Sequence, residues 1–300
     1  MSSGASSPAS AGDTSRGFAF ALAAYLMWGG LPLYLKALEH VPVLEVLAHR
    51  VIWSLPVALA VLLVLRRTDA LRAALADPGM LAMAAVTAAL ISVNWGIYVW
   101  AIQSDQALQA ALGYYINPLF SIALGALVLR ERLSVAQWAA VGLAAAAVVV
   151  LTIETGRLPL VALALTLSWG FYALCKRALP IGPNQGFTLE VLLLCPVALG
   201  YLAWLGARGE LYMAQAGGLD IALLLGCGLV TAVPLMVYAN GAKLLRLSTI
   251  AIMQYIAPTF IFLIAVFIFA EPFGRAQMIA FPMIWAALAL YSFEVLRQRR

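Results

Sequence analysis

Long apolar segments constrain the fold of this chain more than any other feature of its sequence. The 300 residues are 64% hydrophobic and only 10% charged, whereas soluble domains are about one-quarter charged. A helix that crosses about 30 Å of hydrocarbon needs roughly 20 mostly apolar residues. Ten such runs cover residues 18–37, 43–65, 80–102, 107–129, 134–153, 158–175, 187–206, 219–241, 247–269 and 277–296. We therefore predict an all-α polytopic membrane protein with ten transmembrane helices.

The positive charges predict the direction in which these helices cross the membrane. With a cytoplasmic N-terminus, the segments on that side hold 13 of the 18 lysines and arginines, and those on the other side hold four. Arg50 lies within a span. Because basic residues accumulate on the cytoplasmic side, we expect both termini there. Residues 1–17, which are small and polar, are predicted to form a disordered cytoplasmic tail. The net charge of +5 then needs no nucleic-acid partner to explain it.

The two halves of the chain resemble each other. The segment "YINPLFSIALGALVLRERLSVAQW" (115–138) matches "YIAPTFIFLIAVFIFAEPFGRAQM" (255–278) at an offset of 140 positions, and "WGGLPLYLKAL" (28–38) matches "WGFYALCKRAL" (169–179). "LEVL" occurs at 44–47 and again at 189–192. Each half holds five spans, an odd number, so the second half enters the membrane from the opposite side. The sequence therefore predicts two inverted-topology five-helix repeats, at 18–153 and 158–297, an architecture typical of transporters.

Charged side chains within the second span are the first candidates for a functional site. Glu45 and its repeat counterpart Glu190 lie in the first turn of their helices. There they stabilise the helix start or act as carboxylates that carry protons or cations. Arg50 lies about 10 Å inside its span, where it needs a partner, water or a cavity. It is either an anchor between helices or a group that recognises a substrate anion. His49 shares a helical face with Glu45 and Trp53, and it is the best candidate for titration near neutral pH.

Polar and aromatic residues in four other segments are candidates to line a cavity. "NWGIYVWAI" contributes Asn94, Trp95 and Tyr98, and "GYYINP" adds Tyr114 and Asn117. Their alternative role is hydrogen bonding between helices. The candidates from the second half are Trp169, Tyr172, Tyr238, Gln254 and Tyr255. Pro118 and Pro258 each free one backbone carbonyl, which suits a hinge or a cavity wall. Gly142 and Gly228 are among the small residues that let helices approach closely.

Motifs for catalysis or cofactor binding are missing from the sequence. The three cysteines, Cys175, Cys195 and Cys227, have no CxxC spacing, so neither a metal site nor a disulfide framework is expected. There is no HExxH, GxSxG or Walker-type segment either. We predict that the protein is not an enzyme, that it holds no cofactor or metal, and that any transport uses a gradient. The expected partners are the lipid bilayer, a small-molecule substrate and protons; the oligomeric state is not predicted.

Several of these segments resemble one family of transporters. "WGGLPLYLKAL", "LEVLAHRVIW", "NWGIYVWAI", "GYYINPL", "LRERLSVAQW" and "QYIAPT" are similar to segments of the RarD-like branch of the EamA family, in the drug/metabolite transporter superfamily. The resemblance covers roughly residues 18–297. It implies ten helices in two EamA repeats, a bacterial inner-membrane location, and export of small metabolites or drugs. Members are commonly labelled chloramphenicol-sensitivity proteins, a label that does not establish a substrate.

We therefore predict a secondary transporter that works by alternating access. A central cavity is expected between spans one to four and six to nine, with the fifth and tenth spans peripheral. Proton antiport with Glu45 or His49 as the carrier is the predicted coupling, and exchange without protons is the alternative. Arg50 favours substrates with an anionic group, such as amino acids. A channel or a non-transporting scaffold is the competing class of protein.

Overall fold

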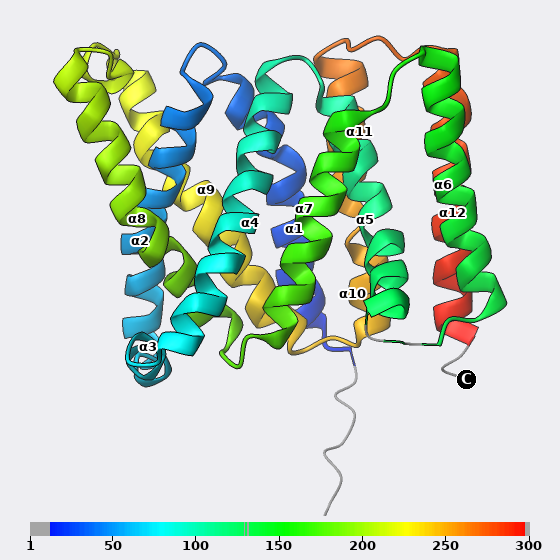
Figure 1. Cartoon of the computed structure of the whole chain (residues 1–300), viewed down its shortest axis with the longest axis horizontal. Helices are drawn as coiled ribbons and strands as arrows, with labels where there is room; N and C mark the ends of the chain where they lie inside the picture. The colour runs from blue at the N-terminus through cyan, green and yellow to red at the C-terminus, as the bar shows by residue number, and fades with distance from the viewer. Residues whose placement is uncertain (1–12, 129, 131, 298–300) are drawn as a thin grey trace, which may run out of the picture.

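The structure, a computed structural model, describes residues 13–128, 130 and 132–297. Within these ranges nine helical segments are long and apolar enough to cross a membrane, and the 19-residue α7 (Leu160–Ala178) completes the ten predicted spans. The others are α1 (Ser15–Lys36), α2 (Val43–Val64), α4 (Pro78–Gln103), α5 (Ala107–Val128), α6 (Val135–Thr155), α8 (Pro183–Arg208), α9 (Gly218–Ala242), the broken span α10 (Leu247–Met253) with α11 (Ile256–Leu263) and η2 (Ile264–Ile268), and α12 (Arg275–Arg297). They run side by side in Figure 1, which confirms the predicted all-α polytopic fold.

Two short helices in the connections were not predicted. α3 (Asp69–Leu75) joins α2 to α4, and η1 (Tyr212–Ala214) joins α8 to α9. They lie at opposite ends of the bundle (Figure 1). We call the end that holds α3 and both ends of the described chain the terminal end, and the end that holds η1 the far end.

Helix ends follow the local sequence. The Thr14 side chain accepts a hydrogen bond of 3.0 Å from the Gly17 N–H and caps α1. α1 therefore begins inside the tail that was predicted for residues 1–17, and residues 1–12 lie outside the described ranges. Ser134 and Gln137 form a capping box at the start of α6, in which each side chain bonds the other's backbone N–H.

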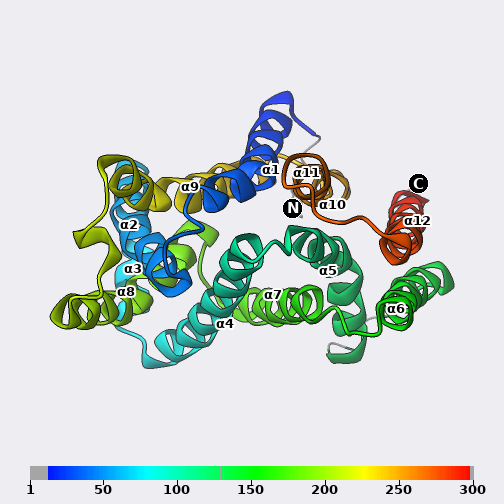
Figure 2. The same cartoon turned by 90° about the horizontal axis from the view of Figure 1, so that it is seen from above.

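Helix packing follows the inverted repeat. The repeat partners α2 and α8 pack together at one side of the bundle, and α6 and α12 pack together at the other side (Figure 2). Between them, α1 packs on α9 as its counterpart α7 packs on α4. Gly29 of α1 lies against Phe260 of α11, and the repeat-related Gly170 of α7 lies against Phe120 of α5. The offsets found in the sequence therefore match contacts in three dimensions.

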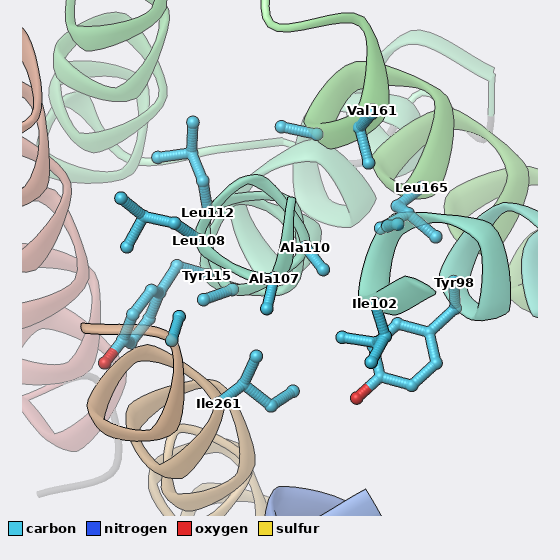
Figure 3. Close-up of a cluster of buried hydrophobic side chains, with 14 of the residues drawn as sticks. Tyr98, Ile102, Ala107, Leu108, Ala110, Leu112, Tyr115, Val161, Leu165 and Ile261 are labelled. Atoms are coloured by element: carbon cyan, nitrogen blue, oxygen red, sulfur yellow. The ribbon is translucent and has the colours of Figure 1, made fainter. Parts of the chain in front are cut away.

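A continuous apolar core surrounds α5. Side chains from α4, α7 and α11, among them Ile102, Leu165 and Ile261, lie around this helix (Figure 3). Gly113 of α5 lets the α7 backbone approach, because a Cβ atom there would come within 2.8 Å of the Ala162 carbonyl oxygen. This packing holds the middle of α5, which carries two of the predicted cavity residues, close to the centre of the molecule.

The two proline hinges that were predicted differ in the structure. Pro258 lies in the first turn of α11, just after the break between Met253 and Ile256 that interrupts the ninth span. Pro118 lies inside α5, which continues without interruption. Because a break exposes backbone groups that cannot remain unpaired in lipid, its position suits a cavity wall.

Candidate functional site

A cavity of about 230 Å³ lies at the centre of the bundle, between the two repeats. Its walls come from α1, α2, α4, α5, α7, α8, α9 and the α10–α11 segment, so α6 and α12 are peripheral, as predicted. The predicted residues that line it are Arg50, Asn94, Trp95, Tyr98, Tyr114, Asn117, Trp169, Tyr172, Tyr238, Gln254 and Pro258. The structure thus gathers residues of both halves around one space.

Arg50 is the charged residue in this lining. Its side chain is 3% exposed, and its Nε donates a hydrogen bond of 3.0 Å to the Thr231 hydroxyl of α9. The guanidinium carbon lies 5.1 Å from the centre of the Trp95 ring, which is the geometry of a cation–π contact. Its Nη1 has no hydrogen-bond partner and, among the described residues, no carboxylate lies within ion-pair distance. A positive charge buried in this way attracts an anionic group of a ligand.

Asn94 presents a carbonyl oxygen on the opposite wall. Its Nδ2 donates to the Leu165 carbonyl at 3.1 Å and to the Ser168 hydroxyl at 2.9 Å. Because a carbonyl oxygen can only accept, the amide nitrogen must face α7, and this assigns the orientation of the side chain. Oδ1 is then left without a partner among the described residues. It can accept a hydrogen bond from a ligand.

Two further polar atoms of the lining lack partners within the described ranges. They are the Asn117 Oδ1 on α5 and the Tyr98 hydroxyl on α4. The Tyr98 ring packs edge-on against Tyr114, with 5.5 Å between the ring centres. Buried polar atoms are almost always hydrogen-bonded in folded proteins, so each exception needs an explanation. Four exceptions around one cavity are explained by a polar ligand.

Aromatic rings form the apolar part of the wall, and some of them were missed in the sequence. Tyr25 and Trp28 of α1 pack with Tyr238 of α9, with ring centres 5.5 to 5.6 Å apart. Trp169 packs on Tyr172 at 5.6 Å. A signal for Trp28 was present in the sequence, because it aligns with Trp169 in the repeat. The other lining residues that were missed are Leu31, Ile91, Phe187, Val230, Thr231, Leu235, Ala257 and Ile261.

Glu45, His49 and Trp53 lie outside the lining of this cavity. The Glu45 carboxylate is fully buried and accepts hydrogen bonds from the backbone N–H groups of Tyr212 and Met213, at 3.0 and 2.9 Å. The expected stabilisation of its own helix start is therefore replaced by a contact with η1 in the other repeat. Trp53 Nε1 donates to His49 Nδ1 at 3.0 Å, and His49 Nε2 lies 3.9 Å from Glu45.

Glu190 and Tyr255 also lie away from the cavity. Glu190 is 1% exposed; it accepts from Lys176 Nζ at 2.7 Å and from the Tyr172 hydroxyl at 3.3 Å. Tyr172 itself lines the cavity, so Glu190 is one side chain removed from it. Tyr255 lines a second pocket of about 330 Å³, together with Tyr115 of α5 and residues of α11 and α12. This second pocket contains no charged residue.

The cysteines and acidic residues form no metal site in the described part of the chain. Cys175, Cys195 and Cys227 are free thiols, and no three side chains of His, Cys, Asp or Glu come together there. The chemistry that the site can perform is therefore recognition by charge, hydrogen bonds and aromatic contact.

The chain is similar to known bacterial membrane proteins along most of its length. The model of the EamA-like transporter family matches residues 15–153. Protein RarD of Streptomyces exfoliatus is 43% identical over 284 residues, which cover 95% of this chain and 90% of that protein. The uncharacterized transporter YojE of Bacillus subtilis is 41% identical and Protein RarD of Escherichia coli is 39% identical, each over 96% of this chain and 97% of the relative.

The fold also matches a solved structure. A crystal structure that is 22% identical aligns with a TM-score of 0.60 over 95% of this chain and 99% of the other. At this identity the match concerns the fold alone. Together with the ten spans and the full-length similarity to RarD proteins, it identifies the class of molecule. The chain is a multi-pass membrane protein that belongs to the EamA-like transporter family, as a RarD-like transporter of the drug/metabolite type.

Proposed function

We propose that this protein is a secondary transporter that exports small zwitterionic metabolites, of the amino-acid class, by alternating access. It acts in the inner membrane of a bacterium, with both termini in the cytoplasm, as the distribution of basic residues indicates. The terminal end of the bundle then faces the cytoplasm and the far end faces outward. The inverted repeat supports the mechanism, because two similar halves can exchange conformations around a central site.

The observation that carries the proposed substrate class is the pairing of unsatisfied groups in the cavity. The Arg50 guanidinium offers a positive charge and a free donor, which suit a carboxylate. The carbonyl oxygens of Asn94 and Asn117 offer free acceptors, which suit an ammonium or amide N–H. The aromatic rings of Trp28, Trp95 and others supply the surface for an apolar side chain. A solute with one carboxylate and one amino group satisfies all three.

The size of the cavity supports a metabolite rather than a drug. Pockets that bind drug-sized ligands measure about 300–1,000 Å³, and this cavity measures about 230 Å³. Export of drugs would require the two repeats to move further apart than they are in this conformation. We therefore assign drug-sized solutes the lower rank among the substrates of this transporter.

Solute counterflow tests the proposal directly. Purified protein in liposomes that are loaded with an unlabelled amino acid is expected to accumulate the same amino acid, labelled, against its gradient. A panel of neutral amino acids, dicarboxylates, nucleosides and cationic drugs defines the class, and we expect the neutral amino acids to give the largest signal. Saturation and counterflow are properties of a carrier. Uptake that neither saturates nor shows counterflow would mean a channel, and no uptake of any solute would contradict the transport proposal.

We also propose that export is coupled to proton entry through the Glu45–His49 pair. These two groups lie 3.9 Å apart and beside a contact between the repeats, and Tyr201 and Tyr212 are the other titratable side chains near Glu45. Acidifying the outer side of loaded proteoliposomes is expected to accelerate efflux of the amino acid several-fold. The variant His49→Gln should keep counterflow and lose much of this acceleration. Efflux that ignores the imposed gradient would make the protein an uncoupled exchanger.

A further inference from the structure

A buried carboxylate of the first repeat clamps the far end of the second repeat. Glu45, on α2, accepts hydrogen bonds from two successive backbone N–H groups at the start of η1, those of Tyr212 and Met213, at 3.0 and 2.9 Å. Hydrogen bonds to an ionised group are shorter and stronger than neutral ones. Because the carboxylate is fully buried, opening this end requires that both bonds break. Glu45 therefore holds the far end closed.

The repeat counterpart of Glu45 makes no such contact. Glu190 bonds to Lys176 at 2.7 Å and to Tyr172 at 3.3 Å, both within its own repeat. The two glutamates occupy the same position in the duplicated "LEVL" segment and lie at opposite ends of the bundle. The protein is thus symmetric in sequence at these two positions and asymmetric in their bonding.

The counterpart of η1 is α3. α2 is followed by Arg66 with a φ of 52°, and α8 by Gly209 with a φ of 70°; α3 and η1 each begin three residues after these left-handed residues. The first two N–H groups of α3, on Asp69 and Ala70, therefore correspond to the two that Glu45 holds. No acceptor in the described part of the protein bonds to either of them, and the Thr68 side chain does not cap the helix.

The partner for these N–H groups lies close by. α3 packs against the first half of α8, where Leu71 and Ala74 share an apolar cluster with Leu189 and Leu193. Glu190 follows Leu189 directly in the chain. An inward movement of α3 along this contact brings its first turn towards the Glu190 carboxylate.

We propose that Glu45 and Glu190 are positioning residues that close the two ends of the transporter in alternation. In the present state Glu45 holds η1, and Glu190 rests on Lys176 and Tyr172. When the repeats exchange conformations, Glu45 releases η1, while Glu190 leaves Lys176 and accepts from the first N–H groups of α3. Tyr172 links this clamp to the cavity, since its ring lines the cavity and its hydroxyl bonds Glu190. The proposal rests on alternating access as the transport mechanism.

The sidedness of thiol labelling tests the clamps. Leu235→Cys places a thiol in the cavity wall, in a background from which the three native cysteines have been replaced. A membrane-impermeant maleimide is added to either side of oriented vesicles. Glu45→Gln is expected to raise the ratio of far-end to terminal-end labelling about tenfold, the factor that corresponds to loss of one charge-assisted hydrogen bond. Met213→Pro removes a donor of the same clamp and should do the same.

Removal of a donor on the other side is expected to act in the opposite direction. Ala70→Pro deletes an N–H in the first turn of α3, where proline is tolerated, and leaves the Glu190–Lys176 pair intact. It should lower the ratio of far-end to terminal-end labelling. Glu210→Gln is the matched control, because this exposed glutamate at the far end pairs with Arg208 of its own repeat; its ratio should equal that of the wild type.

Each outcome assigns the failure to one idea. A gate that shifts raises labelling from one side and lowers it from the other, whereas unfolding raises both. An unchanged ratio in Glu45→Gln and Met213→Pro, or a rise in Ala70→Pro, overturns the alternating clamps. If these variants leave the ratio unchanged while wild-type counterflow persists, the transport function stands and the clamps alone are wrong. If the wild type shows no counterflow, the proposed function fails independently.

Discussion

Arg50→Ala is expected to weaken the binding of a zwitterionic substrate about 10- to 100-fold. The guanidinium is the charged group in the cavity lining, and a hydrogen bond to a charged group contributes roughly 1.5–3 kcal/mol. The unliganded protein should unfold at nearly the same temperature, because the removed charge has no ion-pair partner among the described residues and leaves only the Thr231 hydroxyl without a bond. Removing an unpaired buried charge also removes its desolvation cost.

A thermal-shift titration of the detergent-purified protein measures both effects. A ligand that binds the folded state raises its melting temperature in proportion to its affinity, so the wild type should show a shift that Arg50→Ala loses. Cys195→Ala is the matched control, since Cys195 is the repeat counterpart of Arg50 and lies outside the cavity lining. If Arg50→Ala keeps its ligand-induced shift but melts far below the wild type, the arginine is an anchor between helices.

Features that depend on local sequence were predictable. The spans were predicted to within a few residues, since hydropathy and capping act over one or two helical turns. The repeat also predicted packing, because an offset of about 140 positions pairs Gly29–Phe260 with Gly170–Phe120. Arg50 was recognisable as a cavity candidate because a charge within a span requires compensation. In each case the signal lies in the residue itself or in its duplicate.

Features that depend on contacts between distant segments were not predictable. Glu45 is at a helix start by sequence, yet its hydrogen bonds go to a connection 167 residues away. Thr231 and Tyr25 line the cavity because of the way in which α9 and α1 rotate against α2, and no pattern in their own helices marks that face. α3 and η1 are short enough to escape any periodicity. Their positions follow from the packing of α2, α8 and α9.

The glycines show the same limit, and one of them gives the second large prediction. Gly142 and Gly228 are equivalent by sequence, since both are small residues within apolar spans. In the structure a Cβ atom on Gly142 would meet nothing within 4 Å, whereas a Cβ atom on Gly228 would overlap the Trp53 carbonyl group and lie 2.7 Å from the Ser54 nitrogen. α9 and α2 thus cross backbone against backbone at Gly228, one turn from Arg50.

Gly228→Ala is therefore expected to abolish the native fold or to lower its melting temperature by more than any other single methyl group would. The added atom meets backbone, which cannot rotate away, so the helices must separate, and overpacking of this kind costs about 1–3 kcal/mol or more. Gly142→Ala should leave the melting temperature unchanged or raise it, because alanine favours a helix over glycine by about 1 kcal/mol. Melting curves of both variants in one detergent decide the matter. Equal melting temperatures would mean that α2 and α9 do not cross at Gly228, and the placement of Arg50 against Thr231 would fall with that crossing.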